Sequence, residues 1–287
     1  MMKRFALIIL SLILFATFLI ARGDERKQVA ITLDDLPASN IATFTEQLRI
    51  NKKILDILDQ YQVKATGFVI AQRLFGKMDI LNLWLKEGHD LGNHTYTHMD
   101  FDKVDPPAFK MEIVKGVSKI RKLLRQYKKD LRYFRFPYLH EGNTIEKKKS
   151  IQNFLEENGY TIAPVTINPR DQEYNGPFVK AWGFNDKKLQ DSVKVSYLQQ
   201  VKKKTRESED LSRQLFGREI KHVLVLHLNR INAEVLDQIL KYYSRSGYSF
   251  IPLEDALKDS VYSLKEEYVG SEELTWLERI KHRSGKQ

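Results

Sequence analysis

Short runs of aliphatic and β-branched residues alternate with helix-like segments along most of this chain, and that alternation limits the choice of fold. We expect seven strands, at residues 29–33, 65–70, 89–93, 131–136, 160–167, 222–228 and 248–251. Between them, apolar residues recur at helical spacing, as from Phe44 to Tyr61 and from Phe109 to Leu124. Strands separated by helices pair in parallel, so the sequence predicts an α/β barrel of about seven parallel strands.

The length of 287 residues suits such a barrel as a single unit. We therefore expect one domain at residues 24–287. Residues 172–219 form an insertion before strand six, predicted as part loop, containing Trp182, and part charged helix. We interpret this insertion as a lid or a substrate wall. Residues 258–287 are predicted to be a helical tail that packs on the barrel.

Residues 1–23 have the pattern of a targeting segment. Lys3 and Arg4 precede an apolar stretch at residues 5–20, and residues 21–23 place small side chains at the cleavage-site positions. We expect export to the periplasm, the cell surface or the medium. An uncleaved membrane anchor is left open as the alternative, because the apolar stretch is only slightly short for a spanning helix.

The chain has no cysteine, which leaves His and carboxylates as its metal ligands and excludes disulfides and lipoprotein anchoring. The formal charge is +10, and removal of a leader with Lys3, Arg4 and Arg22 gives 10 − 3 = +7. The lysine runs at residues 147–149 and 202–204 are interpreted as solvated helix faces, with attraction to an anionic polymer or membrane as the alternative. No nucleic-acid motif accompanies the charge, so we expect no nucleic-acid partner.

Two aspartates and two histidines suggest a metal site. Asp34 and Asp35 end the first predicted strand, and His94 and His98 follow the third at a spacing that zinc hydrolases use. Adjacent aspartates repel each other, so their position calls for a cation nearby, although a helix cap or an Asx turn is the structural alternative. Two imidazoles and one carboxylate leave coordination positions open, and the second carboxylate is then available as a proton acceptor.

Three further residues follow later predicted strands. Arg135 ends the fourth strand and is expected to hold Asp34 in a bidentate fork. Asp171 lies in the loop after the fifth strand, and His227 ends the sixth. A histidine after an apolar run is usually a satisfied core residue unless other reactive groups meet it. In a parallel barrel the carboxyl ends of the strands open at one face, so we expect all these groups to converge there.

The five motifs, in this order, resemble those of the polysaccharide deacetylases, the NodB-like enzymes of carbohydrate esterase family 4. The resemblance runs from Val29 to about Leu257. It is carried by Thr-Leu-Asp34-Asp35, His94-Thr-Tyr-Thr-His98, Arg135-Phe-Pro-Tyr138, Asp171 and Leu-Val-Leu226-His227.

The resemblance implies a distorted (β/α) barrel and a set of roles. Asp35, His94 and His98 would bind zinc or another divalent transition metal, with Asp34 as general base and His227 as general acid. It also implies supporting roles, as follows: Arg135 orients Asp34, Asp171 tunes His227, the Tyr138 backbone N–H binds the oxyanion, and Leu226 lines the acetyl pocket. The sequence departs from the family pattern at Phe136, where proline is usual, at Leu139, where glycine is usual, and at Gln172, where tryptophan is usual.

The expected reaction is metal-dependent hydrolysis of N-acetyl groups from an acetylated glycan polymer, with peptidoglycan N-acetylglucosamine as the leading substrate. Chitin oligomers, an exopolysaccharide and O-acetylated xylan are left open, as is the oligomeric state. Competing hypotheses are an amidohydrolase of the same fold acting on small amides, a non-heme iron oxygenase and an inactive glycan-binding protein. An oxygenase would have no catalytic role for Asp34, which is not needed as a metal ligand.

Overall fold

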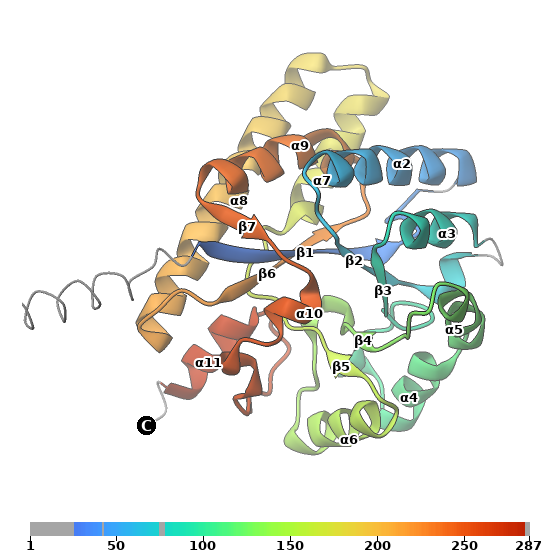
Figure 1. Cartoon of the computed structure of the whole chain (residues 1–287), viewed down its shortest axis with the longest axis vertical. Helices are drawn as coiled ribbons and strands as arrows, with labels where there is room; N and C mark the ends of the chain where they lie inside the picture. Colours follow the sequence, from blue (N-terminus) through green and yellow to red (C-terminus); the bar gives the residue numbers. More distant parts are fainter. Residues whose placement is uncertain (1–25, 42, 75–77, 285–287) are drawn as a thin grey trace, which may run out of the picture.

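Seven parallel strands form one curled sheet with helices on its outside (Figure 1). The computed structural model describes residues 26–41, 43–74 and 78–284. The strands are β1 (Lys27–Leu36), β2 (Thr66–Val69), β3 (Asp90–Asn93), β4 (Tyr133–Phe134), β5 (Thr161–Ile162), β6 (Lys221–His227) and β7 (Tyr248–Phe250). Their order is β5-β4-β3-β2-β1-β6, and β7 pairs with the start of β1. The predicted distorted (β/α) barrel is confirmed.

The barrel is irregular between β5 and β6. We expected one strand at residues 160–167, but β5 stops at Ile162 because Pro164 cannot donate a ladder hydrogen bond. The chain resumes pairing at Ile167, which forms a single parallel bridge with Leu224 of β6. This interruption distorts the ring of strands on the side where the chain leads into the insertion.

The helices follow from capping residues and apolar stripes. In α2 (Phe44–Gln60) the Thr43 hydroxyl caps the helix, and Ile50, Ile54 and Leu58 are buried against the sheet. The other helices are α3 (Asp79–Lys86), α4 (Pro106–Val114), α5 (Val117–Gln126), α6 (Ile145–Glu157), α7 (Asp171–Gly183), α8 (Lys187–Phe216), α9 (Arg230–Arg245), α10 (Leu253–Ala256) and α11 (Trp276–Ser284). Short 3₁₀ turns are η1 (Ala71–Leu74), η2 (Phe101–Lys103), η3 (Pro137–Leu139) and η4 (Ser260–Ser263).

Strand alternation separates two cores. Ala30, Phe68 and Val223 belong to a small cluster inside the barrel, whereas Ile31 and Leu224 belong to the large core between the sheet and the helices. Side chains two residues apart share a face of a strand, so the inward face of each long strand continues into its carboxyl end. This alternation determines which residues reach the site.

The insertion differs from its prediction. Residues 172–219 contain no long loop, because α7 and α8 cover most of them and Trp182 lies in α7. The Asp186 side chain accepts a hydrogen bond from the Leu189 N–H and so starts α8 directly after the turn. Tyr197 and Val201 bury one face of α8 in the core. The insertion is therefore a pair of packed helices, and in Figure 1 it extends beyond the sheet.

The C-terminal tail is helical only in part. Among residues 258–284 only η4 and α11 are helical, and an irregular segment joins them. Trp276 is buried, and its backbone N–H donates to the Val165 carbonyl at 2.7 Å. Arg279 pairs with Glu141 at 2.5 Å. The tail is therefore tied to the barrel, as predicted for Trp276.

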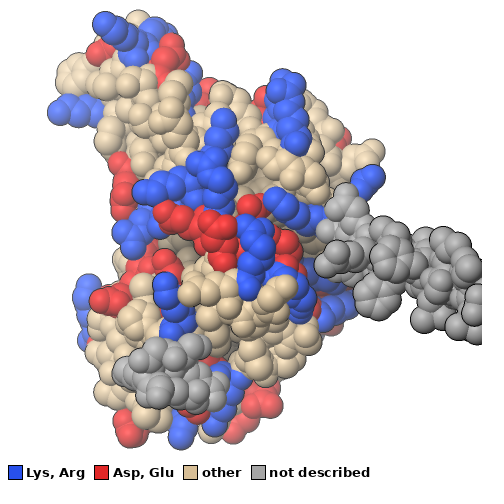
Figure 2. Space-filling view, turned by 90° about the vertical axis from the view of Figure 1, so that its left-hand side faces the viewer, with Lys and Arg blue, Asp and Glu red and all other residues tan. Residues whose placement is uncertain are grey.

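The lysine-rich surfaces are only partly solvated helix faces. Lys148 of the run 147–149 is buried, with its ammonium 2.6 Å from Glu266, so it forms an internal ion pair and contradicts the prediction at that position. On the face in Figure 2, Lys and Arg lie among Asp and Glu and form no continuous basic surface. The predicted leader lies outside the described residues, and no helix of the described ranges is long and apolar enough to cross a membrane.

Gly92 lies within β3 and close to an aromatic ring of the neighbouring strand. A Cβ atom there would overlap the ring of Phe68, which stacks under the Arg135 guanidinium at 4.5 Å. Glycine therefore leaves room for an aromatic ring directly beneath the site.

Replacing Gly92 with alanine should lower the free energy of unfolding by about 1–3 kcal/mol, because the added methyl overpacks the barrel interior. Urea denaturation measures this change. Gly176→Ala in α7 is the control: a Cβ there meets no atom within 4 Å, so the variant should gain up to about 1 kcal/mol from helix propensity. Equal stability of the Gly92 variant and the parent would contradict the packing argument.

Candidate metal and active site

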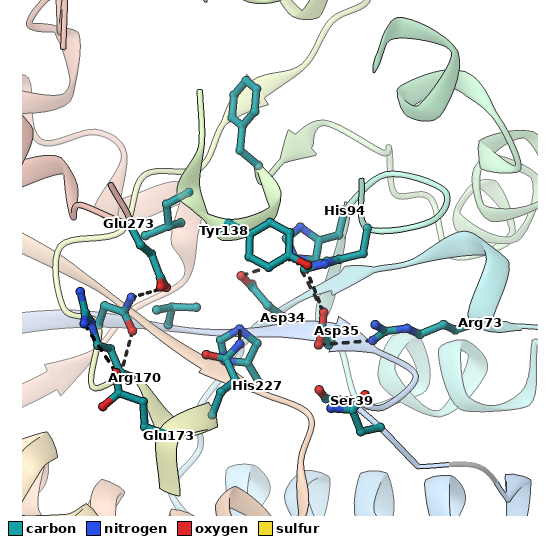
Figure 3. Close-up of a pocket in the computed structure, with 17 residues that line it drawn as sticks. Asp34, Asp35, Ser39, Arg73, His94, Tyr138, Arg170, Glu173, His227 and Glu273 are labelled. Carbon is teal, nitrogen blue, oxygen red and sulfur yellow. Dashed lines mark hydrogen bonds and ion pairs between the residues drawn. The ribbon is translucent and has the colours of Figure 1, made fainter. Parts of the chain in front are cut away.

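A cavity of about 400 Å³ opens at the carboxyl ends of the strands (Figure 3). Asp34 and Asp35 reach it from β1, His94 and His98 from the segment after β3, Tyr138 from η3, and His227 from β6. Asp34 and His227 are register partners on neighbouring strands, which places the two side chains at the same level. The sequence prediction that these groups converge at one end of the barrel is confirmed in position, while their roles remain predictions.

The two aspartates are held differently. Asp34 continues the inward face of β1. Asp35 has a positive φ of 70°, a conformation that few residues besides glycine, asparagine and aspartate adopt. This turn brings the Asp35 carboxylate toward the histidines, with Oδ1 3.5 Å from His98 Nε2 and 3.9 Å from His94 Nε2. Both aspartates are buried, with 3% and 4% of their surface exposed.

His94 presents an oriented and neutral ring. Its Nδ1 lies 2.8 Å from the carbonyl oxygen of Arg135, which requires a proton on Nδ1 and leaves the Nε2 lone pair facing Asp35. Burial lowers the pKa of His94 to about 4 and that of His98 to about 3. Both imidazoles are therefore unprotonated at neutral pH, which is the state that binds a metal.

Asp35, His94 and His98 fit a divalent transition metal. One ligand atom from each lies within 4.8 Å of the others. Among the described residues, Asp35 Oδ1 is buried without a hydrogen-bond partner, which is costly unless a cation or water meets it. Two imidazoles and one carboxylate suit zinc, iron or related ions.

Arg73 is a site residue that sequence reasoning missed. Its Nη1 lies 3.3 Å from Asp35 Oδ2, on the side of the carboxylate away from the histidines (Figure 3). Burial alone would raise the pKa of Asp35, but His227, His98, Arg73 and His94 together lower it below its usual range. No motif signal marks Arg73 in the sequence, because its relation to Asp35 depends on how η1 follows β2.

Arg135 reaches Asp34, but not as the predicted fork. A single nitrogen, Nη1, lies 3.5 Å from both Asp34 oxygens, and Nη2 lies 3.3 Å from the Thr32 hydroxyl instead. The guanidinium lies over the ring of Phe68, 4.5 Å from its centroid, and Nη2 donates to Thr32 in place of a second bond to Asp34. Burial raises the pKa of Asp34, and the charge of Arg135 offsets part of that rise.

His227 belongs to a buried hydrogen-bonded group. Its Nδ1 lies 2.7 Å from Asp171 Oδ1, and its backbone N–H donates to Asp171 Oδ2 at 3.1 Å. The side-chain amides of Asn229 and Asn232 each donate to the same Oδ2 at 2.5 Å. Burial alone would lower the pKa of His227, but the charge and hydrogen bond of Asp171, with smaller effects of Asp35 and Asp34, raise it to about 10. Asp171 begins α7 and is thus not the loop residue we expected.

Tyr138 lies at the rim. Its φ of 58° turns the chain sharply in η3, and its ring packs against His98 with centroids 4.7 Å apart. The side chain is 48% exposed, so it can contact a ligand that enters the cavity. Phe136, the first departure from the family pattern, stacks on Phe101 and Phe109 and also borders the cavity.

The prediction for Leu226 was wrong. Leu226 is fully buried in the core between the sheet and the helices, on the opposite face of β6 from His227. Val225 is two residues before His227, shares its face and lines the cavity. The apolar wall of the cavity on β6 is therefore Val225, and Leu226 contacts no part of it.

Gln172, which stands where tryptophan is usual in the family, contacts His227 directly. Its side-chain amide nitrogen lies 2.5 Å from His227 Nε2, and when the amide is flipped its oxygen can accept a hydrogen bond from a charged imidazole. Gln172 thereby limits how a ligand approaches His227. Asn168, Arg170, Glu173 and Glu273 form a polar wall next to it, none of which sequence reasoning identified.

Comparison with known proteins points to the polysaccharide deacetylases, the family that the motifs resemble. The sequence model described as polysaccharide deacetylase matches residues 21–163, which include the aspartates, both histidines, Arg135 and Tyr138 but end before Asp171 and His227. A peptidoglycan-N-acetylglucosamine deacetylase of Bacillus cereus is 32% identical over 134 residues, which cover 46% of this chain and 43% of that protein. The chain thus spans less than half the length of this curated relative.

Solved structures show the same fold. A polysaccharide deacetylase from Bacillus cereus superimposes with a TM-score of 0.56 at 23% identity and covers 79% of this chain and 92% of its own. A carbohydrate esterase family 4 pseudoenzyme from Bacillus anthracis gives a TM-score of 0.55 at 18% identity, with 82% of this chain and 66% of the other covered. The architecture is therefore shared with proteins described as a deacetylase and as a pseudoenzyme.

Proposed function

Because the chain belongs to the polysaccharide deacetylase family, we propose that it is a metal-dependent hydrolase that removes N-acetyl groups from an amino-sugar polymer. The observation that carries the proposal is the neighbourhood of Asp34 and His227: a candidate base and a candidate acid are register partners on adjacent strands, next to the Asp35–His94–His98 cluster. The spare carboxylate and the buried histidine have no evident structural need at that position.

Asp35, His94 and His98 would hold the metal, which when bound would polarise the acetyl carbonyl and make water more acidic. Asp34 takes the proton of the attacking water, because it is the carboxylate that faces the cavity without being needed as a ligand. The positive charge of Arg135 keeps Asp34 oriented and favours its ionised form. The backbone N–H of Tyr138 is proposed to donate to the carbonyl oxygen as it becomes negative.

His227 is proposed to protonate the departing sugar amine. Asp171 holds the imidazole through Nδ1, so that Nε2 faces the cavity with its proton. Gln172 lies at that nitrogen and would release it when the substrate enters. Val225, in place of Leu226, would contact the acetyl methyl group.

Peptidoglycan N-acetylglucosamine is the proposed substrate. The curated relative of Bacillus cereus is described by that activity, and the predicted leader would bring the protein to the cell wall. The test is acetate release by the zinc-loaded protein from N-acetylated peptidoglycan, chitin oligomers, acetylated xylan and a small cyclic amide. Fastest release from peptidoglycan supports the proposal, turnover of the cyclic amide alone supports a small-molecule amidohydrolase, and tight glycan binding without release supports an inactive relative.

Replacing Asp171 with asparagine should move the alkaline limb of the pH–rate profile to lower pH by about 1–3 units, because it removes the charge that raises the pKa of His227. The proposed acid works only below that pKa, so activity is lost earlier as pH rises. The acid limb, set by Asp34, should move little. Profiles of kcat/KM measure both limbs, and Asp56→Asn on the exposed side of α2 is the control. An unchanged alkaline limb would argue against His227 as the acid.

A further inference from the structure

A second group of ligand-type side chains lies beside the cavity but belongs to no motif. Asp100 caps η2, Asp102 lies within it, and His140 follows η3. One ligand atom from each of these three residues lies within 4.8 Å of the others. They join two segments that follow neighbouring strands, one just beyond His98 and the other just beyond Tyr138.

Asp102 is the unusual member. Its side chain is only 5% exposed, and neither carboxylate oxygen has a hydrogen-bond partner among the described residues. A buried carboxylate in this state is costly, since nearly all buried polar groups in folded proteins have a partner. Oδ2 faces His140 Nδ1 at 3.6 Å, which is beyond hydrogen-bond distance.

The neighbouring lysines do not supply the hydrogen bond that the Asp102 carboxylate lacks. The Lys147 ammonium donates to the backbone carbonyls of Phe101 and Asp102, at 2.8 and 3.1 Å, rather than to a carboxylate. Lys103 lies 3.2 Å from Asp100 Oδ2, and its side chain is largely exposed. Asp100 Oδ1 is on the inner side, 2.9 Å from His140 Nδ1. Two carboxylates therefore face the same imidazole nitrogen.

We propose that Asp100, Asp102 and His140 bind a second divalent cation, separate from the one proposed at Asp35. Two carboxylate oxygens and one imidazole nitrogen suit a borderline ion of the manganese or zinc class better than calcium or magnesium, which prefer oxygen alone. The separations between the ligand atoms are those of groups that converge on one ion after small side-chain movements. Water would complete the coordination.

The second ion would brace the rim of the active site. The rings of His140 and Tyr138 lie 5.8 Å apart between centroids, and Tyr138 packs in turn on His98. An ion that joins η2 to η3 would fix the two segments that carry His98 and Tyr138. Its role is structural, so the proposal does not depend on which glycan, if any, is hydrolysed.

The test is the number of ions bound by the chelated and refilled full chain, measured by equilibrium dialysis with Mn²⁺ and by elemental analysis with Zn²⁺. We expect two ions in the parent, one in Asp102→Asn, one in Asp35→Asn and none in the double variant. His140→Gln should lose the same ion as Asp102→Asn, and Asp130→Asn in an exposed loop is the matched control. An Asp102→Asn variant that binds as many ions as the parent would overturn the proposal.

Thermal unfolding gives a second readout in the Asp35→Asn background, where the first site is removed. Mn²⁺ should raise the melting temperature of Asp35→Asn but not of Asp35→Asn combined with Asp102→Asn, because only an intact second site can gain stability from ligand. An equal rise in both would place the binding elsewhere. Failure of the proposed hydrolysis would instead appear as absence of acetate release with the second site still filled.

Discussion

Replacing Asp34 with asparagine should lower the rate of acetate release by about a hundred- to ten-thousandfold, the usual contribution of a positioned general base, while the protein keeps its metal. Asparagine preserves the shape of the side chain but cannot accept the proton of the attacking water. Asp34 is buried, and Arg135 Nη1 lies 3.5 Å from its carboxylate. The measurements are kcat/KM and bound zinc on the same sample.

Asp56→Asn provides the control for this substitution. It makes the same chemical change on the exposed side of α2, so both activity and metal content should equal those of the parent. Activity retained by Asp34→Asn would remove Asp34 as the base. Loss of zinc along with activity would instead make Asp34 a metal ligand, and Asp35 would then need another role.

Replacing His94 with alanine should remove both metal and turnover. The ring is 2% exposed, its Nδ1 is held by the Arg135 carbonyl, and its Nε2 has one direction in which to bind. Loss of a metal that supplies several kcal/mol of transition-state stabilisation corresponds to a decrease of about a thousandfold or more. Elemental analysis and acetate release measure the two effects.

His282→Ala in α11 is the matched control for His94→Ala, because His282 is exposed and remote from the cavity. Circular dichroism of both variants separates local loss of a ligand from loss of the fold. A folded His94→Ala protein that binds zinc as tightly as the parent would show that the metal site lies elsewhere. Asp35 and His98 would then have to be explained by the ion pairs that they form without a metal.

The barrel and the ends of its strands could be predicted from the sequence. Asp34, His94, Arg135 and His227 each lie at or just after the end of a predicted strand, and in a parallel sheet the carboxyl ends of the strands meet at one face. Residues at strand ends therefore converge whatever the details of packing. This is why the site was predictable while several of its contacts were not.

Packing decided the points at which the prediction failed. One position separates Leu226 from Val225, and in a strand that single step exchanges the core for the cavity. The space that Gly92 leaves for Phe68 and the ion pair of Arg73 with Asp35 depend on side chains from other elements. None of these relations has a signal in the local sequence.

The prediction that part of the insertion is a loop failed for a different reason. Phe178 of α7 and Tyr197 of α8 are both buried. A few widely spaced apolar residues are enough to hold a helix pair against the barrel once the tertiary structure is present. The apolar period was too sparse to be recognised along a single chain.

Acetate release from N-acetylated peptidoglycan by the chelated protein, before and after addition of Zn²⁺, tests whether the protein is a metal-dependent deacetylase. We expect no release from the chelated protein, recovery on addition of zinc, and no recovery in Asp35→Asn or His94→Ala. Release at an equal rate without metal, or no release from any acetylated glycan by a zinc-loaded and folded protein, would contradict it.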